Sequence, residues 1–447
     1  MSGGSRPAVR PRPPAGGTTA RSAPPLPPRA SCRLHIAAHP ADTWLSDVER
    51  FPAIGNNLAV SFGPSLGIEP NEAALRKLAG ARRDLCLGQP GSAIMSSPER
   101  YMQRSHAVPL LDVRDLRVCF GSVTSPLVAV DLLSFQVASG EVLGIVGESG
   151  CGKTATARSI IGLYRNDPRC RVTGQVLFKG IDLVGLSERG MRRIRGREIS
   201  MVFQDPLTCL NPLQRVGTQL AEILRAHTDM SDAAIRARTI ELLRLVGMPQ
   251  PGERIDAYPH QFSGGMRQRV MIALAIACNP SVLIADEPTT ALDVTTQMQI
   301  LTLLAGLRKR IGMAVVLITH DFGVVAEVAD RVLVMYAGQC VESGEVQEIF
   351  RNPQHPYTSG LLASIPSVDA PPQPRLPAIK GSPPSIAGGR AAGCRFRVRC
   401  DYGQTQCLNA PPLLSSPRAR GHLRRCWFPN EQRTGNRTPL TPGPEGA

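Results

Sequence analysis

The chain has 447 residues, of which 42% are hydrophobic, so it is long enough for two or three domains with sizeable cores. Its formal net charge of +15 comes almost entirely from the two ends: residues 1–107 hold 13 basic and 7 acidic side chains, and residues 369–447 hold 12 and 4. The near-neutral middle argues against a basic nucleic-acid groove in a folded core, and the apolar run at 270–278 is shorter than the roughly 18 residues that cross a bilayer.

Residues 1–107 show no sustained hydrophobic period, and we expect them to be disordered. The first thirty residues contain eight prolines, five arginines and no acidic side chain, so they cannot bury enough apolar surface to offset the entropy of ordering. An Arg-rich, acid-poor opening also resembles an organelle transit peptide. A third interpretation is a mis-annotated start, because Met95 and Met102 stand just before the first periodic segment.

The first predicted elements surround a glycine-rich stretch. Residues 110–120 and 127–138 alternate apolar and polar side chains as half-buried strands do, residues 141–147 indicate a buried strand, and a helical pattern begins at Lys153. Between the last strand and the helix lies GESGCGKT (147–154), which matches G-x-x-x-x-G-K-[ST] in the strand–turn–helix context that the match requires.

This loop predicts a nucleoside triphosphate site. Glycines let the backbone curl around an anion, while amide N–H groups and the helix N-terminus supply positive potential. We expect Lys153 to reach the terminal phosphates and the Thr154 hydroxyl to bind Mg²⁺. A chance match by a glycine-rich turn is the weaker interpretation, because strand, loop and helix agree. The residues predicted to contact the nucleotide here are Gly147, Glu148, Ser149, Gly150, Cys151, Gly152, Lys153 and Thr154.

Two later strand ends carry polar groups that complete such a site. Residues 281–293 begin as a buried strand that delivers Asp286 and Glu287, and the strand at 313–318 is followed by His320. The first carboxylate suits Mg²⁺ and its water shell, and the second can take a proton from an attacking water. A lone histidine after a strand is usually structural, but its place beside an acidic strand end favours a functional role.

Between these motifs, residues 219–248 predict two amphipathic helices. Core packing is the default interpretation of their apolar faces. The residues predicted to form those faces are Leu220, Ile223 and Leu224 in the first helix and Ile240, Leu243 and Leu245 in the second.

Four further motifs occur in the order and spacing of ATP-binding cassette (ABC) proteins over about residues 108–350. FSGGMRQRV (262–270) resembles the signature motif of that family, and MVFQDPLTCLNP (201–212) resembles its glutamine loop. ALD (291–293) resembles the D-loop, and ITHD (318–321) resembles the segment with the switch histidine. The chain is thereby identified as a member of the ABC family.

This resemblance implies an α/β fold of the ABC-type P-loop ATPase: a RecA-like core with an antiparallel β subdomain and an α-helical subdomain at about residues 205–278. It implies that ATP is hydrolysed between two cassettes paired head to tail, the second being a homologous or identical subunit. Ser263, Gly264 and Gly265 of one cassette would then grip the ATP held by Lys153 of the other.

The resemblance also implies roles around the phosphates. Glu287 would polarise the hydrolytic water, His320 would hold the γ-phosphate, and Gln204 would contact Mg²⁺ and link the site to the coupled machine. Asp293 would lie across the dimer contact, and Phe120 would stack on adenine, although a phenylalanine at a strand end is commonly a core residue.

The end of the chain narrows the resemblance. Residues 341–367, with NPQHPYT, and GCRFRVRC (393–400) resemble the C-terminal region of the oligopeptide and dipeptide branch of bacterial ABC importers. A small irregular C-terminal domain is therefore expected at 351–428, and a disordered tail at 429–447.

Membership of that branch implies several partners. It implies an ATP-hydrolysing subunit bound peripherally to the cytoplasmic face of the bacterial inner membrane, on two transmembrane permease subunits fed by an extracytoplasmic solute-binding protein. No nucleic-acid partner is expected. The alternative function is a non-transport ABC ATPase acting on nucleic acid or ribosomes, prompted by the net charge. The solute is not readable from the sequence.

Four of the twelve cysteines fall within 33 residues: Cys394, Cys400, Cys407 and Cys426. Their spacing fits no short zinc-finger pattern, and a reducing compartment favours metal binding over disulfides. The importer resemblance places a cysteine set here, with an iron–sulfur cluster in some members. A [4Fe–4S] cluster, zinc and unligated thiols all stay open. We expect the arginines of this segment to favour thiolates and to partly offset the charge of an anionic cluster. They are Arg395, Arg397, Arg399, Arg424 and Arg425.

Cys151 is a departure from the family pattern, which more often has serine there, as it also has at Thr154. Because Cys151 lies just before the amide-rich helix start and two residues before Lys153, we expect its thiol to have a low pKa and to react readily. The alternative is an inert small side chain that faces inward.

Overall fold

The computed structural model describes residues 108–122, 126–290, 292–365, 377–384, 393–415 and 421–430. The predictions made for residues 1–107 and for 431–447 lie outside these ranges. Among the helices described, none combines the length and the apolar character needed to span a bilayer.

The alternating pattern near the start of the cassette produces an antiparallel sheet in the order β2-β1-β4-β5. Its inward-facing side chains, such as Leu111 and Val130, are completely buried against the helix that follows the glycine-rich loop. The predicted strands at 110–120 and 127–138 are confirmed. The strands are β1 (Leu111–Gly121), β2 (Pro126–Val137), β4 (Cys170–Phe178) and β5 (Ile181–Asp182).

A second sheet has the order β11-β12-β10-β9-β3-β8-β7-β6. Five neighbouring strands run parallel to one another: β9, β3, β8, β7 and β6. Beyond β9, the sheet continues with the antiparallel pairs β9–β10, β10–β12 and β12–β11. The predicted buried strands before the loop and before Asp286 and His320 are confirmed as β3, β7 and β8. The strands are β3 (Val142–Val146), β6 (Ile199–Val202), β7 (Val282–Asp286), β8 (Ala314–Thr319), β9 (Arg331–Tyr336), β10 (Gln339–Glu345), β11 (Leu414–Ser415) and β12 (Leu423–Arg424).

Alternate residues of the central strands pack on opposite faces of this sheet. Ile284 and Val316 pack with α4 (Lys153–Ile160) and the antiparallel sheet, whereas Leu283 and Val315 pack with the helices of the other face. Both faces are therefore covered, which is why these strands are continuous apolar runs. The other helices beside the sheets are α5 (Glu188–Ile194), α11 (Val294–Ile311) and α12 (Phe322–Val328).

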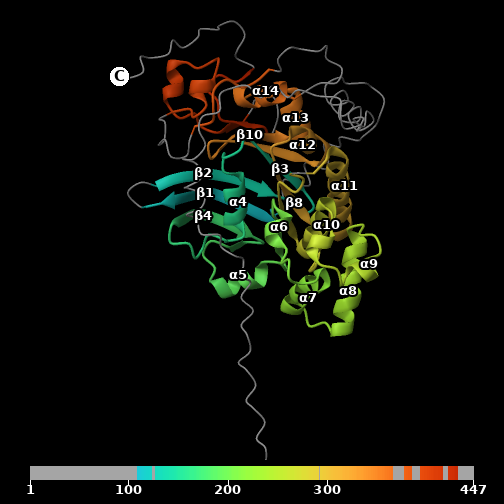
Figure 1. Cartoon of the computed structure of the whole chain (residues 1–447). Helices are drawn as coiled ribbons and strands as arrows, with labels where there is room; N and C mark the ends of the chain where they lie inside the picture. The colour runs from blue at the N-terminus through green and yellow to red at the C-terminus, as the bar shows by residue number, and fades with distance from the viewer. Residues whose placement is uncertain are drawn as a thin grey trace, which may run out of the picture. The chain divides into compact units, whose positions relative to one another are not determined.

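A group of helices lies between β6 and β7 in sequence and away from the antiparallel sheet in space (Figure 1). The two predicted amphipathic helices are confirmed as α7 and α8. Leu220 and Leu224 are buried as expected, but in α8 the deepest side chains are Ile235 and Leu242 together with Leu243, because α8 packs on both α7 and α10. The group comprises α6 (Pro206–Cys209), α7 (Val216–His227), α8 (Asp232–Leu245), α9 (Pro251–Arg254), the short 3₁₀ helix η1 (Pro259–Gln261) and α10 (Gly264–Ile276).

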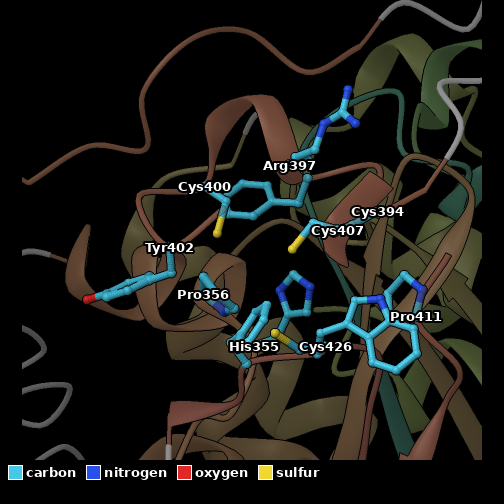
Figure 2. Close-up of a pocket in the computed structure, with 12 residues that line it drawn as sticks. His355, Pro356, Cys394, Arg397, Cys400, Tyr402, Cys407, Pro411 and Cys426 are labelled. Atoms are coloured by element: carbon cyan, nitrogen blue, oxygen red, sulfur yellow. The ribbon is translucent and has the colours of Figure 1, made fainter. Parts of the chain in front are cut away.

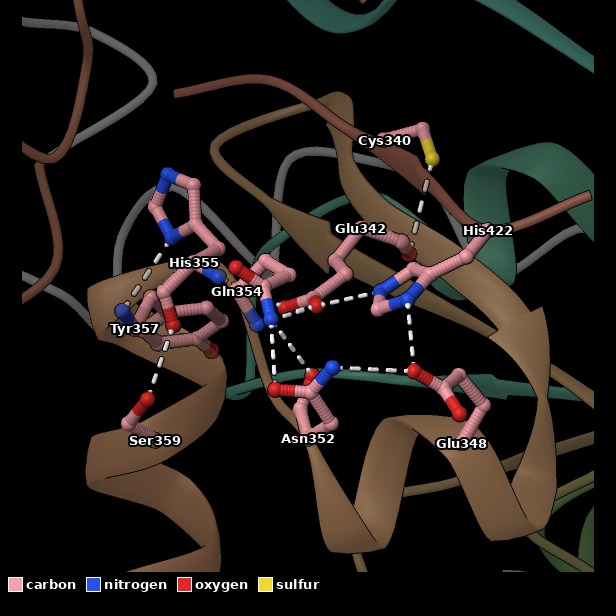
Figure 3. Close-up of polar contacts among 9 residues, drawn as sticks. All are labelled: Cys340, Glu342, Glu348, Asn352, Gln354, His355, Tyr357, Ser359 and His422. Carbon is pink, nitrogen blue, oxygen red and sulfur yellow. Dashed lines mark hydrogen bonds and ion pairs between the residues drawn. The ribbon is translucent and has the colours of Figure 1, made fainter. Parts of the chain in front are cut away.

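The C-terminal part is built onto the edge of the large sheet. β12 pairs with β10, and the completely buried Glu342 of β10 accepts a bond from His422, with Nε2 and Oε1 2.7 Å apart (Figure 3). The backbone N–H of His355 donates to the other oxygen of Glu342 at 2.9 Å. This buried carboxylate therefore joins three segments. The elements are α13 (Val346–Arg351), α14 (Pro356–Ala363) and the 3₁₀ helices η3 (Arg397–Arg399) and η4 (Thr405–Leu408).

Candidate functional site

The predicted polar motifs meet at one edge of the large sheet. The loop at 147–154 follows β3, Asp286 ends β7, His320 follows β8, and Gln204 follows β6. These four strands are neighbours and run parallel, so their carboxyl ends lie side by side. Ligands bind at this edge in open α/β sheets.

Two glycines allow the loop to pass close to neighbouring backbone. A Cβ added at Gly147 would lie 2.2 Å from the carbonyl oxygen of Met335, and one at Gly152 would lie 2.4 Å from that of Ala129. Gly152 also has a φ of +106°, a conformation that favours glycine. The tight curl of the loop therefore depends on these two positions.

The loop presents positive potential at the start of α4. Gly152 is the N-cap of α4 and offers no side-chain acceptor, so the first amides of the helix have no side-chain cap. The buried Lys153 ammonium donates to the carbonyl oxygens of Gly147 at 2.7 Å and Glu148 at 3.1 Å, which holds it inside the loop. An amide-rich helix start with an ammonium beside it has the features that favour anion binding, which is the role that the motif predicts.

Thr154 and Asp286, the two residues predicted to serve Mg²⁺, are brought together. The Thr154 hydroxyl donates to Asp286 Oδ1 at 3.1 Å, and burial raises the pKa of the Asp286 carboxyl. Both groups supply the oxygen ligands that Mg²⁺ prefers, so they fit the ion. The third predicted ligand, Gln204, contacts Glu287.

Glu287 lies at the centre of a polar group formed by three strand ends. Its Oε2 accepts hydrogen bonds from the Gln204 amide at 2.9 Å and the Thr290 hydroxyl at 3.0 Å, and its Oε1 lies 3.5 Å from His320 Nδ1. Glu287 has a φ of +48°, which is costly for a side chain of this kind. The imidazole of His320 is 61% exposed, so it can meet a ligand in solvent.

The predicted signature residues lie at the start of α10. Ser263 is the exposed N-cap of α10, and its hydroxyl accepts the N–H of Met266 at 3.3 Å. A Cβ at Gly265 would lie 2.7 Å from Thr296 Cγ2, so α10 starts against α11. Gly264 and Asp293 are exposed beside them, and hydrogen bonds from Thr296 lower the pKa of the Asp293 carboxyl.

Phe120, the predicted adenine-stacking residue, is half-buried near the end of β1. Its ring packs edge-to-face on Tyr164, with 5.1 Å between the ring centroids. Tyr164 follows α4, so Phe120 packs near the end of the helix that begins in the phosphate loop. The stacking role stays a prediction.

The expectation that the Cys151 thiol has a low pKa is wrong. Its side chain is buried within the loop, and burial raises the pKa of the thiol, outweighing the lowering effect of Lys153, whose ammonium nitrogen lies 4.0 Å from Sγ. The sequence showed the nearby positive charge but not the direction of the side chain. Cys151 is a small residue that fills the interior of the loop.

The four clustered cysteines, Cys394, Cys400, Cys407 and Cys426, line one pocket together with His355 (Figure 2). As the side chains are placed, no three His, Cys, Asp or Glu groups of the described residues converge closely enough to hold a metal ion. The donor chemistry of four neighbouring thiols nevertheless suits a thiolate-bound cluster.

At Cys394 and Cys400, burial outweighs the expected effect of the arginines, although Arg397 does lower the pKa of the Cys394 thiol. Burial raises the pKa of Cys394, and it raises that of Cys400 to about 12. The guanidinium of Arg395 contacts Asp131 and the carbonyl of Ala337. The guanidinium of Arg399 contacts Glu148 and the carbonyl of Lys380. The charged groups of Arg395 and Arg399 are therefore paired with residues other than the cysteines.

Sequence reasoning missed two residues that contact the phosphate loop. The two guanidinium nitrogens of Arg399 donate to the two carboxylate oxygens of Glu148 at 2.6 and 2.8 Å, and this contact raises the pKa of Arg399. The hydroxyl of Tyr357 accepts the backbone N–H of Glu148 at 2.9 Å. Both residues follow the loop by more than 200 positions, and no local pattern signals such a contact.

Comparison with known proteins agrees with the motifs. Residues 130–290 match the ABC transporter family, and residues 341–407 match the family described as oligopeptide/dipeptide transporter, C-terminal region. A probable peptide ABC transporter ATP-binding protein of Sinorhizobium fredii is 50% identical over 322 residues, 72% of this chain and 96% of that protein. The oligopeptide transport ATP-binding protein OppD of Bacillus subtilis is 51% identical over 306 residues, 68% of this chain and 85% of that protein.

A dimeric ATP-binding cassette solved with ADP and phosphate is 28% identical over 53% of this chain and 98% of its own, with a TM-score of 0.48. The strength and length of the sequence matches confirm the predicted α/β ABC-type ATPase fold and the predicted branch. The chain belongs to the oligopeptide/dipeptide branch of the ABC transporter ATP-binding proteins.

Proposed function

We propose that this chain is the ATP-hydrolysing subunit of a bacterial ABC importer for dipeptides, oligopeptides or related small solutes. The observation that carries the proposal is the meeting of the phosphate loop, the Thr154–Asp286 pair and the Glu287 group at one sheet edge. The names of the relatives, which are peptide transport ATP-binding proteins, supply the transported class.

In this proposal the groups of the site divide the work on ATP. The amides at the start of α4 and Lys153 bind the phosphates, and Thr154 with Asp286 would hold Mg²⁺, which neutralises phosphate charge. Glu287 orients the attacking water and accepts its proton, because its carboxylate is fixed by Gln204.

The proposed site is completed by a second cassette. Ser263 and Gly264 are exposed and lie beside the exposed Asp293, so they form a surface that a second subunit can contact. The head-to-tail arrangement would set this surface over the ATP held by Lys153 of the partner. That partner is a homologous or an identical subunit.

The membrane partners follow from the branch to which the chain belongs. We place the chain peripherally at the cytoplasmic face of the bacterial inner membrane, on two permease subunits that receive solute from an extracytoplasmic binding protein. Leu213 supports a contact near the helical group, because it follows the glutamine loop and its side chain is 85% exposed.

Affinity purification of the full chain from detergent-solubilised membranes tests this proposal. We expect two multispanning proteins and a second cassette to co-purify, and the ATPase rate of the complex to rise with peptide-loaded binding protein. Recovery of the chain with RNA in a salt-sensitive complex, without membrane subunits, would instead favour the non-transport ATPase.

We further propose that Cys394, Cys400, Cys407 and Cys426 hold a [4Fe–4S] cluster. The support is the pocket that all four side chains line, and ligation would release the thiol protons of Cys394 and Cys400, whose pKa values burial raises. The cluster would supply a covalent link between parts of an irregular segment. It takes no part in the hydrolysis of ATP described above.

Anaerobic purification from iron-replete cells tests the cluster. Bound [4Fe–4S] gives brown protein with broad absorption near about 400 nm and roughly four irons per chain, which Cys400→Ser removes. A stoichiometric zinc content would replace the cluster with a zinc site. Colourless protein free of both metals would leave the thiols unligated.

A further inference from the structure

Every polar group of Glu148, in the phosphate loop, has a partner that restrains it. Its backbone N–H donates to the Tyr357 hydroxyl at 2.9 Å, its carbonyl accepts the Lys153 ammonium at 3.1 Å, and its carboxylate receives two bonds from Arg399. Two of these partners lie outside the loop, in α14 and at the end of η3. The conformation of the loop is therefore tied to the C-terminal part of the chain.

Arg399 is also held in place by contacts with residues other than Glu148. Its side chain is only 5% exposed, its Nε donates to the carbonyl of Lys380 at 2.8 Å, and its guanidinium lies 5.7 Å from the ring centroid of Tyr336 and 5.9 Å from that of Phe396. A planar guanidinium fixed in this way makes a two-point contact that a flexible surface ion pair does not.

An aromatic cluster anchors the segment that carries Arg399. The ring centroid of Phe396 lies 5.2 Å from that of Tyr336 and 5.4 Å from that of Tyr357, and all three side chains are buried. Val146, the residue just before the loop, belongs to the same core cluster. Packing therefore sets the distance between η3 and the loop.

Charge gives this contact a consequence for nucleotide binding. The Glu148 side chain is 24% exposed and belongs to a loop that binds a multiply charged anion. An unpaired carboxylate at this point would repel the phosphates, and Arg399 neutralises it. Because the Glu148 carbonyl also holds Lys153, a displaced Glu148 would move the ammonium as well.

The geometry points to Arg399 as a positioning residue for ATP binding: from the cysteine-bearing C-terminal segment, it neutralises Glu148 and fixes the phosphate loop. This inference rests on the proposed function, since it concerns the same nucleotide site. It assigns to the C-terminal segment a direct part in the affinity for nucleotide. Arg399 acts through Glu148 and does not touch the reacting atoms.

Titration of the full chain with MgADP tests the inference, with Arg399→Gln, Glu148→Gln and the double variant. We expect Arg399→Gln to raise the Kd about tenfold, since it leaves one unpaired charge beside the phosphates. Adding Glu148→Gln should return the Kd to within about threefold of the wild-type value, because the repelling charge is gone. Arg225→Gln is the matched control: it makes the same substitution, but that guanidinium is 53% exposed and pairs with Asp232.

Two further readouts separate charge neutralisation from general damage. The loss in Arg399→Gln should shrink as salt rises from about 0.05 to about 0.5 M, because salt screens the exposed part of the repulsion. In the assembled complex the KM for ATP should rise while kcat stays within about twofold. A folded Arg399→Gln chain with wild-type Kd, or a double variant weaker than the single one, would overturn the inference. A wild-type chain that binds no nucleotide contradicts the proposed function instead.

Discussion

The geometry of Glu287 is unusual at the scale of a single residue. Its backbone has a φ of +48°, a cost that surrounding structure must offset, and its carboxylate accepts bonds from Gln204 and Thr290. Such strain is typical of functional positions, where a side chain must point in one direction. Here the strained turn directs the carboxylate toward the histidine of the next strand end, His320.

We expect Glu287→Gln to retain ATP binding and to slow hydrolysis about 100-fold or more, because the amide keeps the shape but cannot accept a proton. The measurement is the ATPase rate of the assembled complex beside a nucleotide-binding titration. Glu327→Gln, the same change on the exposed side of α12, is the control and should hydrolyse ATP at the normal rate. Near-normal turnover of Glu287→Gln would remove the proposed role.

The buried Cys151 leads to a prediction opposite to that from its sequence context. Because the Cys151 side chain is buried whereas Cys209 is exposed, we expect N-ethylmaleimide to modify Cys151 more slowly than Cys209 by at least about tenfold. Peptide mass spectrometry after brief treatment of the folded chain measures both rates. Equal rates at the two cysteines would show that the loop opens in solution.

At the scale of elements, a charged contact links the helix after the phosphate loop to α5. Arg195 donates to the carbonyl oxygens of Ile161 and Gly162, just past the end of α4, and its Nη1 lies 2.7 Å from Glu188 Oε1. The guanidinium thus satisfies carbonyls that a helix end leaves without partners. Its hydrogen bond lowers the pKa of the Glu188 carboxyl below the usual 4.5.

The pH dependence of stability follows from that shift. A carboxyl whose pKa is lower in the folded chain contributes stability above its unfolded pKa, and this contribution is lost as pH falls through the folded pKa. We expect Glu188→Gln to reduce the free energy of unfolding by at most about 1 kcal/mol at pH 7, since the pair is partly exposed. The difference should fade below about pH 4.5. Urea unfolding at several pH values measures it, and in an Arg195→Gln background the substitution should have a smaller pH-dependent effect, because only the more exposed Arg192 still contacts Glu188.

Local periodicity was enough to predict several elements and not others. The elements that could be predicted each carry their own pattern of apolar residues; they are β1, β2, β3, β7, β8, α4, α7 and α8. The buried face of α8 differs in detail, because contacts with two other helices and not the helix alone decide which side chains are covered. Pairing of β12 with β10 joins segments about 80 residues apart, which no periodicity reveals.

The site was predictable to the extent that each motif is local. The phosphate loop, Asp286 and His320 each stand at or just after the end of an apolar strand, and parallel strands bring such ends together. Arg399 was not predictable as a partner of Glu148, because 251 positions separate them and the contact depends on the packing of Phe396. The direction of the Cys151 side chain also required the folded loop.

At the scale of the whole molecule, the phosphate loop and the signature residues Ser263, Gly264 and Gly265 belong to different elements of the cassette. Lys153 begins α4, whereas Ser263 is the N-cap of α10, whose first turn packs against α11 at Gly265. We expect full-length Glu287→Gln to form a dimer with MgATP, because ATP is retained between the two surfaces, and Lys153→Ala to stay monomeric. Size-exclusion chromatography with light scattering measures this. Dimers of equal abundance without nucleotide would contradict ATP-dependent pairing.

Peptide uptake by the reconstituted complex tests the central claim most directly. The chain would be reconstituted in proteoliposomes with its co-purifying membrane subunits and second cassette. Binding protein and labelled peptide are added on the side of the membrane opposite the cassettes, and ATP is supplied on the cassette side. We predict accumulation of peptide that requires ATP and falls with Glu287→Gln in this chain by about the same factor as hydrolysis. Accumulation that proceeds unchanged with Glu287→Gln, or without ATP, would contradict the account.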